Sequence, residues 1–305
     1  MNATALDQIQ LNFSPAALGA LNVIIAIILF GVALDLRVAD FRAVLRRPQG
    51  LAVGLCCQFL LLPSLAWLCI IVLQPSASIA LGLLLLAACP GGNVSNFLTA
   101  MAQGNAALSV SLSGLSTLAS IVMTPVNFMF WAGHYAPAES LLRELSLTPS
   151  DIVLTVMLIL VIPTLCGMGV TARFPAVAAR IKQPMRRLSM IFLGLFIVAA
   201  LFGNWRAFLG HVGVAFWIVA IVNALGLACG YALTKLAGLP ETDRRAVSFE
   251  TGIQNSGFGL IICFNHFAGL GGMAMIVAWW GVWHLISGWS LATFWRRRGL
   301  RPRSS

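Results

Sequence analysis

Two stretches of this sequence decide its fold: CPGGNVSN at residues 89–96 and ETGIQNSG at residues 250–257. Each interrupts a long apolar segment, the first within 77–100 and the second within 245–267. Proline removes a backbone hydrogen-bond donor, and adjacent glycines loosen a helix further. We therefore predict two helices that break at mid-length. A simple kink is the alternative, and it is all that we expect at three other prolines: Pro63, Pro125 and Pro163.

The apolar segments around these stretches indicate a membrane protein. Of the 305 residues, 59% are hydrophobic and 9% are charged, whereas soluble domains carry about 25% charged residues. Such a chain needs lipid as its solvent, so we predict an all-α, polytopic membrane bundle of about nine transmembrane helices. The connections are short, which predicts a single membrane domain over residues 1–305. The expected spans are 16–34, 50–73, 77–100, 105–130, 152–171, 187–203, 209–236, 245–267 and 272–295.

The placement of Lys and Arg predicts the orientation of this bundle. With nine spans, 17 of the 19 basic residues fall on one side of the membrane. Cytoplasmic loops are enriched in Lys and Arg, so the C-terminus is expected in the cytoplasm and the N-terminus outside. The net charge of +10 then indicates topology rather than a nucleic-acid partner. Composition favours a bacterial inner membrane.

The spacing of the two breaks predicts an inverted repeat. The breaks fall in the third and eighth spans, five spans apart, and an odd offset reverses the direction through the membrane. Spans one to four would then mirror spans six to nine, with the fifth unpaired. Paired interrupted spans mark the binding sites of many transporters. We expect a core unit of crossing broken helices around 77–130 and 245–295, with panel-type helices from the remaining spans.

Glu250 is the one acidic residue that lies well within a span. An ionised side chain at that depth is costly unless it is paired. No Lys or Arg is expected within a span, so Glu250 is either protonated or neutralised by a mobile cation. Hard cations bind several oxygen ligands. Oxygen-bearing side chains occur close to Glu250 or in neighbouring spans, at Gln58, Ser95, Asn96, Ser109, Ser113 and Gln254.

Some of these polar residues have a second interpretation. Ser109 and Ser113 are four residues apart on one helical face, so they are equally explained by packing between membrane helices. His284, taken by itself, indicates a hydrogen-bonded core residue. The seven cysteines lie in apolar runs without a CxxC pair, so we expect packing roles and neither disulfides nor a zinc-type site.

Taken together, CPGGNVSN, ETGIQNSG, the lone Gln58 and the segment LSVSLS at 108–113 resemble the bile acid/sodium symporter family, with the apical sodium-dependent bile acid transporters among its members. The likeness extends over essentially the whole chain. Two positions depart from the family pattern. Ser113 stands where threonine is common and keeps the hydroxyl, whereas Asn93 stands where a hydroxyl residue is common and leaves the identity of the substrate open.

The resemblance implies two sodium sites and a substrate site. The first sodium site would comprise Ser95, Asn96, Ser109, Ser113 and Glu250. The second would comprise the side chains of Gln58, Glu250 and Gln254 with the main-chain carbonyls of Thr251 and Ile253. The substrate would lie beside the crossing of the broken helices, at Asn93, Val94, Asn255, Ser256 and His284.

The implied function is sodium-coupled import of a small organic anion, such as a bile acid, a keto acid or a pantoate-like carboxylate, by alternating access. Two sodium ions beside one carboxylate leave a single positive charge, which a monocarboxylate would neutralise. We expect no cofactor other than about two sodium ions. One alternative is a proton-coupled transporter or antiporter with Glu250 as the carrier, and another is a receptor built on a transporter fold. A membrane enzyme is not expected, because GxSxG is absent and no nucleophile has an evident partner base.

Overall fold

The computed structural model describes residues 15–34, 48–144, 154, 157–203, 205–267 and 269–299. These residues form helices, and an isolated β-bridge joins Gly91 and Gln254. The first half contains α2 (Pro15–Ala33), α4 (Pro48–Cys56), η1 (Cys57–Leu61), α5 (Leu62–Leu73), α6 (Ala77–Ala88), α7 (Asn93–Met101), α8 (Ala106–Gly133) and α9 (Ala136–Glu144). The second half contains η2 (Met157–Val161), α11 (Ile162–Arg173), α12 (Pro175–Gly203), α13 (Trp205–Leu236), α14 (Glu241–Gly252), α15 (Ser256–His266) and α16 (Gly271–Arg298).

Both predicted breaks are present. The third apolar segment is divided into α6 and α7 at residues 89–92, and the eighth is divided into α14 and α15 at residues 253–255. Among the described residues, three continuous helices are long and apolar enough to cross a membrane: Pro48–Leu73, Ala106–Gly133 and Ala215–Leu236. The count of nine spans therefore stays a prediction. The start of the fifth expected span, at residues 152–153 and 155–156, lies outside the described residues.

Two helices differ from the prediction, one in its first residue and one in being present at all. α12 begins at Pro175, twelve residues before the expected start of that span. Proline is favoured in the first turn of a helix, and the added turns are rich in basic residues, so a hydrophobicity pattern does not detect them. α9 is a short helix that was not predicted, and it packs on α6 and α8.

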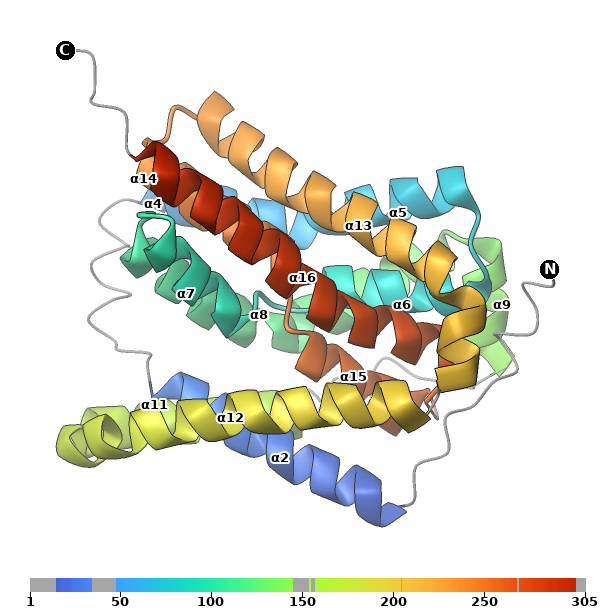
Figure 1. Cartoon of the computed structure of the whole chain (residues 1–305), viewed down its shortest axis with the longest axis horizontal. Helices are drawn as coiled ribbons and strands as arrows, with labels where there is room; N and C mark the ends of the chain where they lie inside the picture. The colour runs from blue at the N-terminus through green and yellow to red at the C-terminus, as the bar shows by residue number, and fades with distance from the viewer. Residues whose placement is uncertain are drawn as a thin grey trace.

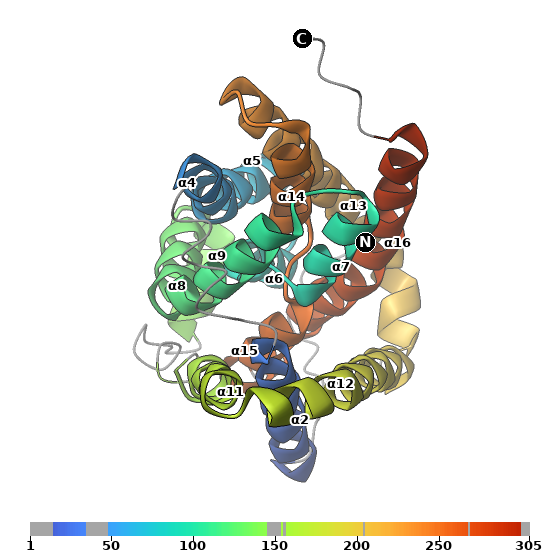
Figure 2. The same ribbon diagram turned by 90° about the vertical axis from the view of Figure 1, so that its left-hand side faces the viewer.

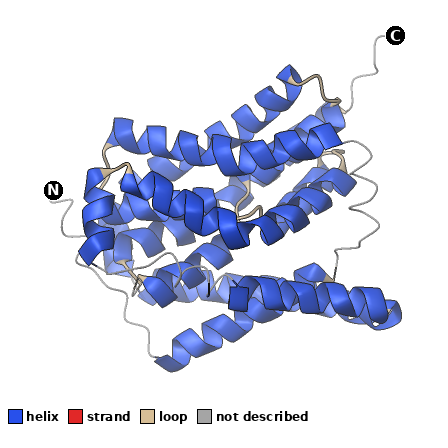
Figure 3. Ribbon diagram, turned by 180° about the vertical axis from the view of Figure 1, so that it is seen from behind, coloured by secondary structure: helices blue, strands red, loops and turns tan. Residues whose placement is uncertain are grey.

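The helices are arranged as a layer beside a larger body. α2, α11 and α12 pack against one another and form the lower layer in Figure 1 and Figure 2. The same layer lies along the bottom of the view from behind in Figure 3. α4, α5 and α13 lie with the broken helices instead, because α4 packs on α8 and α13 packs on α14. α2, α11 and α12 thus form a separate layer, and the division into a core unit and a panel stays a prediction.

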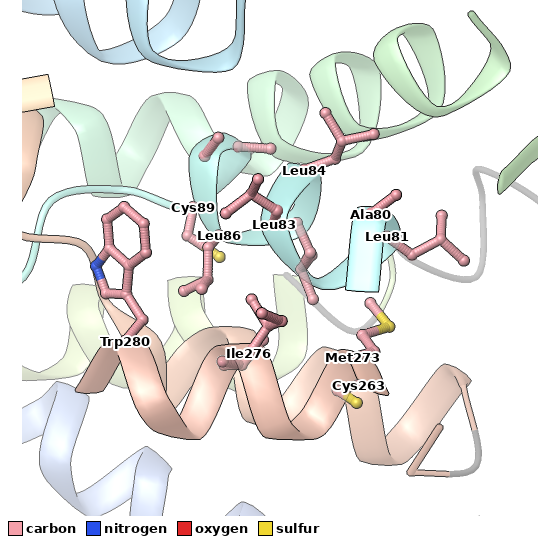
Figure 4. Packing of buried hydrophobic residues seen from close by; sticks show 14 of the residues in the cluster. Ala80, Leu81, Leu83, Leu84, Leu86, Cys89, Cys263, Met273, Ile276 and Trp280 are labelled. Atoms are coloured by element: carbon pink, nitrogen blue, oxygen red, sulfur yellow. The ribbon is translucent and has the colours of Figure 1, made fainter. Parts of the chain in front are cut away.

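The hydrophobic core is centred on α6. Its sequence ASIALGLLLLAA is apolar on every face, and all twelve residues are buried, as expected of a helix surrounded by others. Figure 4 shows Leu83, Leu86 and Cys89 facing Ile276 and Trp280 of α16. α6 thus holds the third-span break at a fixed place against α16.

Candidate functional site

The two breaks meet each other at main-chain level. The amide of Gly92 donates a hydrogen bond to the carbonyl of Ile253 at 2.9 Å, and the amide of Asn255 donates to the carbonyl of Pro90 at 3.0 Å. These two bonds pair the broken segments as short antiparallel strands. The broken helices therefore cross at their interruptions, as predicted. Unpaired backbone groups at membrane depth are costly, and this pairing satisfies four of them.

The carboxylate of Glu250 lies beside this crossing, 2% exposed, on the last turns of α14. Its Oε1 atom accepts hydrogen bonds from the hydroxyl groups of Ser95, Ser109 at 2.6 Å and Ser113 at 2.9 Å. Asn96 Oδ1 accepts from the hydroxyl groups of Ser109 at 2.8 Å and Ser113 at 3.2 Å. α7, α8 and α14 thus bring all five residues of the first predicted sodium set together, and we call them the carboxylate cage.

The carboxylate cage contains more hydrogen-bond acceptor atoms than serine hydroxyl hydrogens that can bond to them. Ser95 lies within hydrogen-bond range of both Glu250 Oε1 and the carbonyl of Gly92, and Ser113 lies within range of three acceptor atoms. Each serine hydroxyl carries one hydrogen, so it can donate to one acceptor at a time. The remaining contacts bring lone pairs together. A proton on Glu250 or a cation among the oxygens removes that repulsion.

No basic side chain neutralises Glu250 among the described residues. Arg245 lies on the same helix and is buried, near the start of α14. Its guanidinium donates to Glu241 at 2.9 Å and to the carbonyl of Ala102 at 2.7 Å, away from Glu250. Gly91 closes the other side of the carboxylate, because a Cβ atom there would lie 2.5 Å from Glu250 Oε2.

The second predicted set is built around two glutamines. Gln58 lies on η1, a single π-helical turn between α4 and α5, and such turns often occur at functional sites. Its Nε2 atom donates to the carbonyl of Cys89 at 2.7 Å and to Gln254 Oε1 at 3.0 Å. Gln254 Nε2 in turn donates to the carbonyl of Thr251 at 2.8 Å. We call the side chains of Gln58 and Gln254, together with the carbonyls of Cys89 and Thr251 that they contact, the glutamine pair.

Two details of the glutamine pair differ from the implied ligand set. The carbonyl of Ile253 already accepts the hydrogen bond from Gly92. The main-chain oxygen of Glu250 lies 3.4 Å from Gln254 Nε2 and is its contact with the glutamine pair. The carboxylate of Glu250 accepts hydrogen bonds from the serines of the cage instead. A role for the Glu250 carboxylate in both sets stays a prediction.

Four of the predicted substrate residues, Asn93, Val94, Asn255 and Ser256, lie at the end of a break or in the first turn of the helix that follows it, whereas His284 lies on α16. Asn255 caps α15 by accepting from the amide of Phe258 at 3.0 Å, and Ser256 is buried behind it. Val94 is partly buried on α7. His284 is 5% exposed, and its Nδ1 atom has no hydrogen-bond partner, so the bond expected of a core histidine is not formed at that nitrogen. The side chain of Asn93 lies outside the described residues.

Two further polar residues contact the breaks and were not predicted. Thr124 Oγ1 donates to the carbonyl of Ala88 at 2.7 Å, and Asn223 Nδ2 donates to the carbonyl of Gly252 at 2.7 Å. Both are fully buried. For Asn223 the available signal is the one that identified Gln58, a polar side chain in an otherwise apolar span, whereas Thr124 is one of many hydroxyl residues in its span. This signal is weak, because such residues also bind helices together without further function.

Paired broken helices that meet beside a buried carboxylate are typical of secondary transporters. Comparison with known proteins agrees with this class. The model of the sodium bile acid symporter family matches residues 22–211, so the chain belongs to this family.

Three relatives show the range of the family. The chain is 30% identical to the uncharacterized sodium-dependent transporter YocS of Bacillus subtilis, over 91% of this chain and 83% of that protein. It is 31% identical to the probable chloroplastic sodium/metabolite cotransporter BASS2 of rice, over 90% of this chain and 63% of the relative. It is 28% identical to the human ileal sodium/bile acid cotransporter, over 77% of this chain and 66% of the relative. These relatives are sodium-dependent transporters and not enzymes.

Proposed function

We propose that this protein is a sodium-coupled symporter of a small organic anion. The observation that carries the proposal is the carboxylate cage. Its buried carboxylate has no basic partner among the described residues, and the hydroxyl and amide oxygens around it outnumber the hydrogens available for hydrogen bonds. A bound sodium ion would supply the missing positive charge and accept several of these oxygens as ligands. The residues assigned to this first ion are Ser95, Asn96, Ser109, Ser113 and Glu250.

A second sodium ion is assigned to the glutamine pair. Gln58 and Gln254 would turn their carbonyl oxygens toward the ion, and Glu250 and the carbonyls of Thr251 and Ile253 would complete the site. The half-helix α14 ends at Gly252, and the C-terminal end of a half-helix carries the partial negative charge that attracts cations. About two sodium ions per transported anion would follow.

The substrate is assigned to the place where α7 and α15 begin. The N-terminal ends of both half-helices lie at the crossing, and their partial positive charge favours an anion. The proposed contacts are Asn93, Val94, Asn255, Ser256 and His284. The substrate class is a carboxylate such as a bile acid, a keto acid or a pantoate-like acid, which fits the substrates that the names of the relatives state.

Alternating access would then move the layer of α2, α11 and α12 relative to the body that contains the crossing. Sodium would order the crossing first, because the cage and the glutamine pair both adjoin the loops that hold the substrate residues. We place the protein in a bacterial inner membrane with its C-terminus in the cytoplasm. The triplet Arg296–Arg298 at the end of α16 supports that orientation.

Proton coupling is the second candidate, and the crowded cage is also the observation that favours it. A proton on Glu250 would allow the carboxyl group to donate to a neighbouring oxygen. The two candidates differ in the ion that they need. A proton carrier responds to a pH gradient in sodium-free buffer, whereas the proposed symporter does not.

Uptake into proteoliposomes tests the function. Vesicles with an inward sodium gradient are supplied with radiolabelled taurocholate, pyruvate or pantoate and compared with vesicles in potassium. At least one anion is expected to accumulate in sodium, and the Glu250→Gln variant is expected to lose that uptake. Glu139→Gln is the matched control, because Glu139 is an acid on α9 whose side chain is 40% exposed and pairs with Arg143, away from the cage. Full sodium-driven uptake by Glu250→Gln, or uptake driven equally by a pH gradient in potassium, would contradict the proposal.

A further inference from the structure

The hydrogen bonds at the crossing define a local two-fold relation between the breaks. Gly92 bonds to Ile253, and Asn255 bonds to Pro90. A two-fold rotation that exchanges the two segments therefore places Pro90 on Ile253, the two acceptors, and Gly92 on Asn255, the two donors. The same register matches Cys89, the first residue after α6, with Gly252, the last residue of α14. This is the relation that an inverted repeat predicts.

These two matched carbonyls are bound in the same way. Gln58 Nε2 donates to the carbonyl of Cys89 at 2.7 Å, and Asn223 Nδ2 donates to the carbonyl of Gly252 at 2.7 Å. Each amide comes from the long helix that precedes its broken helix, α4–η1–α5 in the first half and α13 in the second. Asn223 is therefore the counterpart of Gln58.

The two amides differ in their carbonyl oxygens. Gln58 Oε1 accepts from Gln254 Nε2 at 3.3 Å. Asn223 Oδ1 is buried without a hydrogen-bond partner, and the whole residue is 0% exposed. Buried polar atoms in folded proteins are nearly always paired, because an unpaired one loses its hydration without compensation. The oxygen of Asn223 is therefore open to a partner that the described residues do not supply.

Asn223 lies directly against the carbonyls assigned to the second sodium ion. One turn further along α13, a Cβ atom on Gly226 would lie 3.3 Å from the carbonyl oxygen of Thr251 and 3.5 Å from the Cα atom of Gly252. The backbones of α13 and α14 therefore approach closely here. Gly252, to which Asn223 bonds, lies between Thr251 and Ile253, whose carbonyls belong to the proposed ion site.

We propose that Asn223 is a positioning residue of the second sodium site. Its amide N–H fixes the carbonyl of Gly252 and thereby orients the carbonyls on either side of it, and its free oxygen gains a partner when sodium is bound. This inference rests on the proposed function, because it assigns a role within the second ion site.

The test is a sodium titration of the thermal stability of the purified full-length protein, with potassium chloride replacing sodium chloride at constant ionic strength. Ligand binding to the folded state raises stability with a midpoint that reports affinity. In Asn223→Leu, the sodium concentration at half-maximal stabilisation is expected to rise about tenfold or more, the usual effect of losing a residue that orients metal ligands. Asn127→Leu is the matched control, because Asn127 is a buried asparagine on α8 that bonds to its own helix at Met123. Its midpoint is expected to stay within about twofold of wild type.

The outcomes separate this inference from the proposed function. An unchanged midpoint in Asn223→Leu, with lower stability in both salts, would show a purely structural residue and overturn the inference while the sodium site stands. No sodium response in wild type would overturn the proposed function itself. If Asn223→Leu does not fold, Asn223→Ala, which also lacks the donor but adds no bulk, is measured instead. A raised midpoint in that variant supports the inference, and a wild-type midpoint rejects it.

Discussion

The carboxylate cage and the glutamine pair are neighbours with different hydrogen-bond balances. In the cage, three hydroxyl hydrogens face a larger number of acceptor atoms on Glu250, Asn96 and Gly92. In the glutamine pair, each amide carries both donors and an acceptor, and Gln58 and Gln254 satisfy each other. The proposed cation would therefore offset unpaired acceptor atoms in the cage, whereas the pair is already balanced without one. This difference predicts that the cage dominates the response to sodium.

Replacement of Glu250 has the largest expected effect. Glu250→Gln removes the charge that holds the cation, and loss of one partner of a buried ion pair costs about 3 kcal/mol or more. The sodium-specific rise in stability is therefore expected to disappear. In potassium the variant should be at least as stable as wild type, because a neutral amide with its own hydrogens relieves the crowding of acceptors. Thermal unfolding in both salts measures both effects.

A glutamine variant that is much less stable than wild type in potassium would contradict this comparison. That result would mean that the hydrogen bonds of the cage stabilise the Glu250 carboxylate without a bound cation.

Removal of a cage hydroxyl should have the next largest effect. Ser109→Ala deletes an oxygen that contacts both Glu250 and Asn96, so sodium affinity is expected to fall about tenfold. Ser111→Ala is the matched control on the same helix, because residues two apart do not share a face. A sodium titration of each variant gives the two midpoints. Equal midpoints would place the ion away from Ser109.

Replacement of Gln58 should weaken the second ion and leave the first. Gln58→Leu removes the donor to Cys89 and the partner of Gln254, but it leaves every contact of the cage in place. The sodium dependence of uptake is expected to become less steep, with a Hill coefficient that falls from about two toward about one. Retained steepness would indicate that the glutamine pair binds no ion.

Replacement of Thr124 has the smallest expected effect on sodium. Thr124 holds the carbonyl of Ala88 and contacts neither ion set, so Thr124→Val should cost about 1–3 kcal/mol of stability from the unsatisfied carbonyl. The loss should be equal in sodium and potassium. A loss confined to sodium would show that the α6 end of the crossing also takes part in ion binding.

The sequence predicted the breaks and the cage because polar and helix-breaking residues stand out in an apolar background. Glu250, Ser109 and Ser113 are brought together as expected once α8 and α14 are placed side by side. Periodicity did not reveal which helices form the separate layer, since lipid-facing and protein-facing surfaces are equally apolar. For the same reason, the positions of α5 and α13 beside the broken helices became clear only in the structure.

Single polar residues were the hardest to interpret. Asn223 stands in an apolar span, as Gln58 does, and Thr124 stands among other hydroxyl residues, but no spacing connects either one with the break that it contacts. Their partners are main-chain carbonyls, which carry no sequence signal. The unpaired oxygen of Asn223 depends on the packing of α13 against α14, so only three-dimensional coordinates reveal it.

The most direct test of the cage is equilibrium binding of radioactive sodium to the purified protein, with Glu250→Gln measured beside wild type. Wild type is expected to bind about two ions saturably, with competition from unlabelled sodium but not from potassium. The variant should lose this binding while remaining folded. Absence of saturable sodium binding in folded wild-type protein would contradict the account and transfer the role of Glu250 to protons.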